Sequence, residues 1–163
     1  MALLLAFSDT HGDIISAEKI VKLYPQAAKI LHLGDFVSDS IILKKLFPDK
    51  DVLAVNGNCD GFVHRETIPD ERILDIEGKK ILMVHGHRFG VKSELERLAK
   101  YAKQKEADLV LFGHTHIPID VEKLGIHLLN PGSPSYPNGI GYPSYALIEV
   151  GHGMIETRVM DID

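Results

Sequence analysis

Two hydrophobic patterns alternate along this chain of 163 residues. Short apolar runs typical of buried β-strands are separated by segments whose apolar residues recur every three to four positions, as in amphipathic helices. The apolar runs predict strands at 2–7, 29–33, 52–55, 72–76, 80–84, 108–112, 117–121, 126–129, 144–150 and 154–160. The periodic segments predict helices at 13–24, 38–47 and 93–105. Pro25 and Pro48 end the first two helices, and Ser93 with Glu96 has the spacing of a capping box at the start of the third.

The order of these elements indicates the fold class. The first half is β-α-β-α-β, which predicts parallel strands joined by right-handed crossovers. In the second half, the short turns in "EGKK" and "VGHGM" predict hairpins and therefore antiparallel strands. We expect an α/β protein with more than one sheet. The length and the absence of a repeat or linker predict a single domain over 1–163.

Composition and charge narrow the function classes. The chain is 45% hydrophobic and 25% charged, as in ordinary soluble domains. Its net charge of −5 argues against sequence-independent binding of long nucleic acid, but it allows a small phosphorylated ligand at a local positive site. The single cysteine, Cys59, excludes an internal disulfide and fits a reducing cytoplasm. "MALLLAF" is too short for a signal sequence, so we expect a cytoplasmic protein without a membrane span.

Polar residues follow the carboxyl ends of five predicted strands. In open α/β sheets, these ends form the edge where ligand sites are built. The residues are Asp9 and His11 in "SDTH", Asp35 in "GDF", Asn56, Asn58, Cys59 and Asp60 in "NGNCD", His85 and His87 in "HGH", and His114 and His116 in "GHTH". Each alone has a structural explanation, such as a helix cap or a turn. Together, carboxylates and imidazoles at one edge would be costly to bury unless a metal binds them.

The number of donors favours two metal ions over one. The candidate metal ligands are Asp9, His11, Asp35, Asn58, His85, His114 and His116. Their number exceeds that of the ligands in a tetrahedral structural zinc site, but a bridging carboxylate would let two ions share them. The mixture of imidazole, carboxylate and amide suits Mn, Fe, Zn, Co or Ni better than Mg or Ca. Two divalent ions would leave the site with a net positive charge that attracts a phosphate anion.

The histidines of "VLFGHTHIPI", residues 110–119, lie two positions apart. In an extended segment, residues i and i+2 project to the same side. We therefore expect His114 and His116 to reach adjacent ions while Thr115 points away.

The ordered motifs "DTH", "GD", "GNCD", "HGH" and "GHTH", followed by "NPGS" at 130–133, resemble those of the calcineurin-like metallophosphoesterase superfamily, in particular its small prokaryotic phosphodiesterase branch. The resemblance implies a four-layer α-β-β-α sandwich with two mixed sheets and a dinuclear site at one end. It also implies two divalent ions, with Mn preferred and Ni, Fe, Zn or Co as alternatives. The implied ligands are Asp9, His11 and His116 for the first ion, Asn58, His85 and His114 for the second, and Asp35 as the bridge.

The implied activity is hydrolysis of a phosphate ester, most readily a diester, by in-line attack of a metal-activated water. The expected partner is a small phosphorylated substrate, and whether the ester is a cyclic nucleotide, another diester or a monoester stays open, as does oligomerisation. The alternative is a binding scaffold, because a trafficking-complex subunit shares this fold with an altered site. A nuclease acting on long DNA is disfavoured by the charge.

One position departs from the family pattern. Many members have a histidine where this chain has Cys59, and a neutral thiol is a poorer acid than an imidazolium. Cys59 is therefore either a buried packing residue or a catalytic residue, in an enzyme that depends more on its metals and favours esters with good leaving groups. The other expected catalytic residues are Asp35, His85 and His87, of which His87 supplies acid function, hydrogen-bonds the phosphate or has a structural role.

Several further residues receive secondary expectations. Asn130 and Ser133 are expected to shape a loop under the site. Two roles are open for Arg65, Arg88 and Lys92: contact with the substrate, or a position on the solvated surface. We expect purely structural roles for His32, His64, His127 and His152.

Overall fold

The computed structural model describes residues 1–62, 64–139 and 141–163. One five-stranded sheet has the order β10-β9-β1-β2-β3 in these residues. Its strands are β1 (Ala2–Phe7), β2 (Lys29–His32), β3 (Asp51–Ala54), β9 (Ser144–Gly151) and β10 (Met154–Asp161). As the sequence predicts, β1, β2 and β3 are parallel, while β9 is antiparallel to β1 and to β10.

The other five-stranded sheet of the described residues has the order β4-β5-β6-β8-β7. Its strands are β4 (Glu71–Ile76), β5 (Lys79–Val84), β6 (Leu109–Leu111), β7 (Ile119–Lys123) and β8 (Ile126–Asn130). The pairs β5–β6 and β6–β8 are parallel, and the pairs β4–β5 and β7–β8 are antiparallel. Both sheets are therefore mixed, as predicted.

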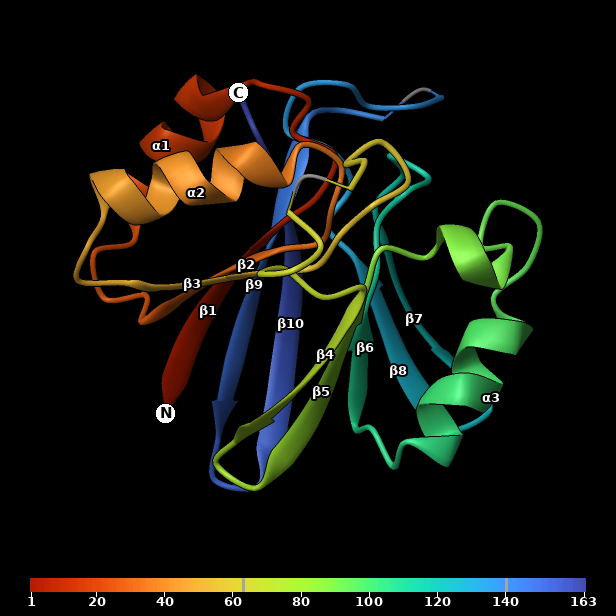
Figure 1. The fold of residues 1–163 in the computed structure, drawn as a ribbon. Coiled ribbons are helices and arrows are strands. Elements are labelled where there is room, and N and C mark those ends of the chain that lie inside the picture. Colours follow the sequence, from red (N-terminus) through yellow and green to blue (C-terminus); the bar gives the residue numbers. More distant parts are fainter. Residues whose placement is uncertain (63, 140) are drawn as a thin grey trace.

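The helices cover the outer faces of the sheets (Figure 1). α1 (Ile14–Leu23) and α2 (Val37–Leu46) lie against the first sheet, and α3 (Glu96–Gln104) lies against the second. Apolar side chains fill the space between the two sheets and the two spaces between sheet and helices. This layering confirms the α-β-β-α sandwich. None of the helices in the described part of the chain is long and apolar enough to cross a membrane.

The first residues of the helices show which capping signals in the sequence predict a helix start correctly. The side chain of Asp13 accepts a hydrogen bond from the N–H of Ser16 (3.2 Å) and so caps α1. The capping box predicted at Ser93 is wrong, because α3 begins at Glu96. Gly90, at φ 65°, ends the short 3₁₀ helix His87–Phe89, and its carbonyl accepts a hydrogen bond from the N–H of Ser93 (2.9 Å). Ser93 is therefore held in a turn, and the Glu94 carboxylate accepts from the first N–H groups of α3 instead.

The strand β7 begins two residues later than predicted. Its predicted start, Ile117, donates its N–H to the hydroxyl of Thr115 (3.1 Å), and Pro118 has no N–H for a sheet. The loop that carries His114 and His116 therefore runs to Pro118, two residues further along the chain than the apolar pattern indicates.

Candidate metal centre

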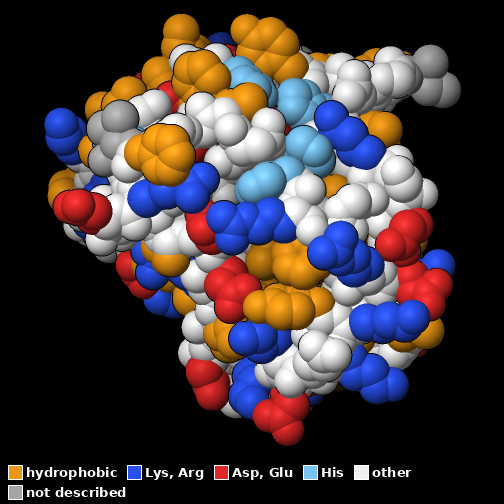
Figure 2. Space-filling view, turned by 45° about the vertical axis from the view of Figure 1, so that its right-hand side comes forward, with side chains coloured by type: hydrophobic (Ala, Val, Ile, Leu, Met, Phe, Trp, Pro, Cys, Tyr) orange, Lys and Arg blue, Asp and Glu red, His pale blue; other side chains and the backbone are white. Residues whose placement is uncertain are grey.

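The structure brings the candidate ligands to one end of the sandwich, at the carboxyl ends of the strands. Asp9 and His11 follow β1, Asp35 follows β2 and Asn58 follows β3, all in the first sheet. His85 follows β5, and His114 and His116 follow β6, in the second sheet. Figure 2 shows histidines (pale blue) gathered on this face, with lysine or arginine side chains (blue) beside them. Basic side chains thus lie beside the histidines despite the net charge of −5.

Four of these residues form a compact group. Asp9, His11, Asp35 and His116 each offer one ligand atom, and these atoms lie within 4.8 Å of one another. Oδ1 of Asp9 and Nε2 of His11 are buried and have no hydrogen-bond partner among the described residues. Such atoms are costly to bury unpaired, and a divalent cation would satisfy both. The residues therefore fit a metal ion.

Asp9 is oriented so that one of its carboxylate oxygens, Oδ1, is left to bind a metal ion. Its Oδ2 accepts hydrogen bonds from the hydroxyl of Ser8 (2.6 Å) and the backbone N–H of His114 (2.9 Å). Its Oδ1 lies 3.2 Å from Nε2 of His116. The hydroxyl of Ser133 also donates to the Asp9 carbonyl (2.8 Å), so the loop expected to shape the site does support it.

A second group of donors lies on the other side of Asp35. Nε2 of His85 is 3.0 Å from Oδ1 of Asn58 and 3.4 Å from Oδ1 of Asp35. The rings of His85 and His114 have centroids 5.2 Å apart. The other oxygen of Asp35, Oδ2, lies 3.8 Å from Nε2 of His11. The two oxygens of Asp35 thus face the two groups, a placement compatible with a bridging carboxylate.

Two of the histidines are fixed through Nδ1. His85 donates from Nδ1 to the carbonyl of Leu33 (2.7 Å), and His116 donates from Nδ1 to the carbonyl of Tyr136 (2.7 Å). Because a carbonyl only accepts, Nδ1 carries the hydrogen in both neutral rings and Nε2 keeps its lone pair. This arrangement is typical of histidines that bind metals.

Left-handed backbone turns direct the ligands inward. The φ angles are 55° at Asp9, 47° at His11, 58° at Asp35, 70° at His114 and 59° at His116. The segment with the last two is therefore not extended, and that premise of the sequence prediction is wrong. The backbone N–H of His114 binds Asp9 in this conformation, which a continuing strand would not allow. Thr115 does point away from the donors, since its hydroxyl accepts from Asn130 (3.0 Å).

The electrostatics leave the two carboxylates and His114 ready for a cation. Burial favours a higher pKa for Asp9, but the neighbouring rings of His116 and His85 outweigh it and lower the pKa. At Asp35, burial is likewise outweighed by hydrogen bonding to His85, and the pKa is lowered. Burial and the nearby charges of His85 and Lys92 lower the pKa of His114 to about 4. At neutral pH the two carboxylates are ionised and His114 is neutral.

Asp60 positions the site without belonging to the donor cluster. Its carboxylate accepts from the N–H groups of Gly57 (2.6 Å), Asp35 (2.8 Å) and Val37 (2.8 Å), which joins the loops after β2 and β3. Gly57 must be small, because a Cβ there would lie 2.2 Å from Oδ1 of Asp35. The motif "GNCD" marked Asp60, but its backbone partners could not be inferred from the sequence.

A buried chain of hydrogen bonds supports the loop after β1. His32 accepts from the N–H of Gly34 (3.2 Å) and donates to the hydroxyl of Thr10 (2.9 Å), which donates to Asp39 (2.5 Å). Asp39 also accepts from the N–H of Gly12 (2.9 Å). Burial lowers the pKa of His32, so its ring is neutral. His32 is structural, as expected, whereas nothing in the sequence indicated Asp39.

Cys59 is exposed, so its interpretation as a buried packing residue is wrong. Its backbone N–H donates to Oδ1 of Asp35 (2.9 Å), so the chain at Cys59 is tied to the site although the residue is exposed. Cys59 lines a cavity of about 240 Å³ whose other lining residues are Phe36, Val37, Ser38, Asp60 and His64. Partial burial and the charge of Asp35 raise the pKa of the thiol to about 11. The thiol is therefore neutral at physiological pH.

His87 lies beside the second group of donors. Its ring centroid is 5.4 Å from that of His85 and 6.1 Å from that of His114. Its Nδ1 is buried and lacks a hydrogen-bond partner within the ranges that the structure describes. Burial and the charge of His85 lower the pKa of His87, which favours a neutral ring.

The basic residues near the motifs differ in their contacts. Arg88 forms an ion pair with Asp70 (2.7 Å). Arg65 donates to the carbonyl of Gly61 (3.1 Å) and lies over the ring of Phe62, 5.0 Å from its centroid. Lys92 lines a cavity of about 330 Å³ together with Thr115, the residue between the candidate ligands His114 and His116. Of the three, Lys92 is the best placed to attract an anion.

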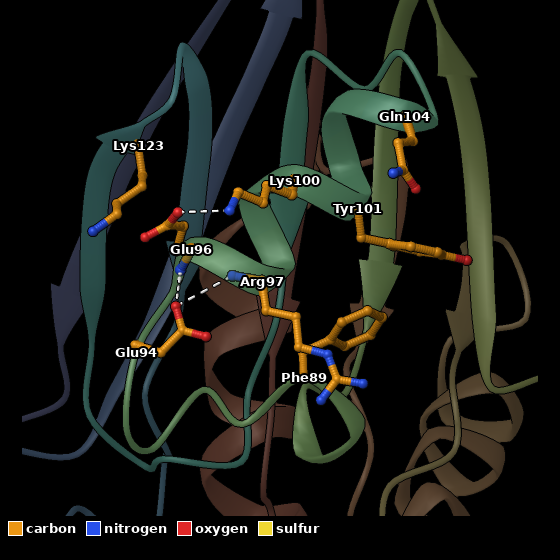
Figure 3. A pocket seen from close by; sticks show the side chains of 8 residues that line it. All are labelled: Phe89, Glu94, Glu96, Arg97, Lys100, Tyr101, Gln104 and Lys123. Carbon is orange, nitrogen blue, oxygen red and sulfur yellow. Dashed lines mark hydrogen bonds and ion pairs between the residues drawn. The ribbon is translucent and has the colours of Figure 1, made fainter.

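A separate cavity of about 510 Å³ lies over α3, on the outer face of the second sheet (Figure 3). Its lining mixes Glu94 and Glu96 with Arg97, Lys100 and Lys123, and Glu96 pairs with Lys100 (2.7 Å). None of the candidate ligands lines it, so it is distinct from the metal centre.

The sandwich and its carboxylate–imidazole cluster define a metalloprotein with its site at the strand ends. A sequence model described as the calcineurin-like phosphoesterase superfamily domain matches residues 1–153. The chain belongs to this superfamily, as its motifs indicated. Membership implies divalent metal ions, and the cluster of Asp9, His11, Asp35 and His116 is a candidate site for them.

Individual proteins agree with this assignment. Phosphodiesterase YfcE of Escherichia coli K12 is 29% identical over 91% of this chain and 88% of its own. The probable metallophosphoesterase YsnB of Bacillus subtilis is 31% identical, covering 96% and 89%. A predicted phosphoesterase from Streptococcus pneumoniae superimposes with a TM-score of 0.76 at 26% identity, over 98% of both chains. Zinc-complexed Vps29 of Entamoeba histolytica, at 23% identity and a TM-score of 0.75 over 98% of both chains, shares the fold.

Proposed function

We propose that this protein is a phosphodiesterase that uses two divalent metal ions to hydrolyse a small phosphorylated substrate. The observation that carries the proposal is the pair of unpartnered buried atoms, Oδ1 of Asp9 and Nε2 of His11, inside a cluster of ionised carboxylates and oriented imidazoles. The names of relatives such as the phosphodiesterase YfcE support the same reaction class.

The donors divide into two sets around Asp35. Asp9, His11 and His116 would hold one ion, Asn58, His85 and His114 would hold the other, and Asp35 would bind both. This mixed donor set suits Mn best among Mn, Ni, Fe, Zn and Co. When bound, such ions supply a nucleophile at neutral pH and stabilise the charge that develops on the phosphoryl group.

The protein groups around the ions have distinct tasks. Leu33 and Tyr136 keep Nε2 of His85 and His116 directed at the site through their carbonyls. His87, with its lowered pKa, is better suited to hydrogen-bond a phosphate oxygen than to protonate a leaving group. The neutral Cys59 thiol is a weak acid, which favours substrates whose alcohol leaves readily.

The alternative, a binding scaffold, shares the fold but does not need the full donor set. Here that set is present and is fixed by hydrogen bonds to the backbone, which favours catalysis. The net charge of −5 favours a small substrate over long nucleic acid, and the single cysteine supports our proposal of a cytoplasmic location.

The test is reconstitution of metal-stripped protein with Mn²⁺, Ni²⁺, Zn²⁺ or Mg²⁺ in turn. Each preparation is assayed on bis-p-nitrophenyl phosphate and on p-nitrophenyl phosphate, and bound metal is counted by elemental analysis. We expect two ions per chain and faster turnover of the diester, highest with Mn²⁺. Turnover of neither substrate with any metal would favour the scaffold, and a monoester preference would change the assignment to a phosphatase.

A further inference from the structure

Four rings line an open pocket, here called the aromatic cavity, beside the first group of ligands. His11, Phe36, His116 and Tyr136 line it, and its volume is about 330 Å³, within the range of small-molecule sites. The ring centroids of Phe36, His116 and Tyr136 lie 5.1, 5.2 and 5.5 Å from that of His11. These spacings are those of packed aromatic rings. Figure 2 shows hydrophobic side chains (orange) bordering the histidines on this face.

Phe36 occupies this place against its own conformational preference. Its φ is 67°, a left-handed conformation that bulky residues rarely adopt, and 40% of it is exposed. Asp60 accepts hydrogen bonds from the N–H groups of Asp35 and Val37, so it fixes the backbone on both sides of Phe36. Core packing does not account for a strained and partly exposed ring, and strain of this kind concentrates at functional sites.

Tyr136 is tied to the metal cluster through its backbone. Its carbonyl accepts from Nδ1 of His116 (2.7 Å), and its N–H donates to the hydroxyl of Ser133 (2.9 Å). The ring itself is 56% exposed and stands edge-on to His11, with an interplanar angle of 82°. The cavity therefore has one wall on each of two loops, and both loops are anchored to metal ligands.

We infer that this cavity binds a planar aromatic group of the substrate, a nucleobase or an aryl ring, next to its phosphate. The inference rests on the proposed function. His11 and His116 belong both to the ligand cluster and to the cavity wall, so a phosphate at the cluster places the adjoining part of the ester against the rings. Sugar or alkyl groups have no π-face to pack there, whereas an aromatic group gains stacking with Phe36 and Tyr136.

The test measures binding of simple phosphates to the metal-loaded protein by calorimetry. Two pairs isolate the aromatic group: AMP against ribose 5-phosphate, and phenyl phosphate against methyl phosphate. Inorganic phosphate reports the metal centre alone. We expect the aromatic member of at least one pair to bind about tenfold more tightly, the effect of stacking one ring. Preference within the first pair identifies a nucleobase, and preference within the second alone identifies an aryl group.

Variants connect the preference to the cavity. Phe36→Gly, which suits the left-handed backbone, and Tyr136→Leu should each reduce it at least threefold while inorganic phosphate binds as before. Tyr142→Ala is the control, because Tyr142 is 69% exposed and does not line the cavity. Equal affinities within both pairs, with inorganic phosphate still bound, would overturn the inference and leave the proposed function standing. Failure of inorganic phosphate to bind would instead overturn the proposed function.

Discussion

The backbone N–H of His114 donates a 2.9 Å hydrogen bond to Oδ2 of Asp9. Asp9 follows β1 in the first sheet and His114 follows β6 in the second, so this bond joins the two sheets at the site. It also fixes the carboxylate so that Oδ1 faces His116. The segments that carry Asp9 and His114 can approach this closely because residue 113 is glycine. A Cβ there would lie 1.8 Å from the Ser8 hydroxyl and 2.7 Å from Oδ2 of Asp9.

Gly113→Ala should therefore displace Asp9 and weaken metal binding. Such overpacking lowers the free energy of unfolding by about 1–3 kcal/mol. Chemical denaturation and elemental analysis measure both effects. Gly141→Ala is the matched control, because among the described residues the atom nearest to its Cβ would be the carbonyl oxygen of Asn138, at 3.3 Å. Full metal content in Gly113→Ala would contradict the role of this contact.

Asp35→Asn should remove bound metal and lower diester turnover at least 10²-fold, because a neutral amide cannot neutralise charge on both sides of the site. Metal content and kcat are measured on the same preparation. Asp49→Asn, an exposed carboxylate in a turn, is the control. Retention of two ions by Asp35→Asn would argue against the bridging role.

Cys59→His should raise turnover selectively for substrates with poor leaving groups. The thiol, with a pKa of about 11, is a weaker acid than an imidazolium, and histidine keeps the backbone N–H that binds Asp35. Rates are compared across diesters whose leaving alcohols differ in pKa. Cys59→Ser controls for loss of the thiol alone. An equal change on every substrate would show that position 59 does not act on the leaving group.

His87→Ala should lower turnover about tenfold and leave metal content unchanged. Its ring lies beside His85 and His114 and keeps a buried Nδ1 without a partner in the described structure, which suits contact with a phosphate oxygen. Steady-state kinetics separate KM from kcat. His87→Asn, which keeps a hydrogen-bond donor, should restore part of the loss; if it does not, a packing role is indicated.

Metal affinity should fall as pH decreases from neutral to mildly acidic. Burial favours a lower pKa for His85, but the nearby carboxylates of Asp35 and Asp9 raise it, and the adjacent Asp9 carboxylate raises the pKa of His116. In the metal-free protein, these rings therefore hold protons to higher pH than an ordinary histidine, and a cation must displace them.

Calorimetry of Mn²⁺ binding in buffers with different ionisation enthalpies counts the displaced protons. His152→Gln, which changes an exposed histidine in the β9–β10 turn, should leave the count unchanged. Mn²⁺ affinity that stays constant across this pH range would contradict the raised pKa values.

The sequence was most informative where polar side chains recur after the ends of the strands. The apolar runs placed the strands, and the polar residues behind them placed Asp9, Asp35, His85 and their neighbours at one edge, because parallel strands end together. The two hairpins were likewise readable from "EGKK" and "VGHGM". These features depend on short-range patterns, which the sequence contains in full.

The features that the sequence did not reveal depend on contacts between distant segments. The left-handed turns at His114 and His116 follow from the bond to Asp9, 105 residues away. The backbone partners of Asp60 and the exposure of Cys59 arise in the same way, from loops that meet only in the folded chain. The aromatic cavity has no sequence signal either, because Phe36 has the pattern of an ordinary apolar residue at the start of a helix.

The division of the donors between two sheets has a thermodynamic consequence. Asp9 and Asp35 belong to loops of the first sheet, whereas His85 and His116 belong to loops of the second. An ion held by both sides would act as a cross-link that exists only in the folded state. A ligand of this kind raises the free energy of unfolding by about 2.7 kcal/mol when its free concentration is about 100 times its dissociation constant. Metal supply would then set the stability of the folded chain as well as its rate of catalysis.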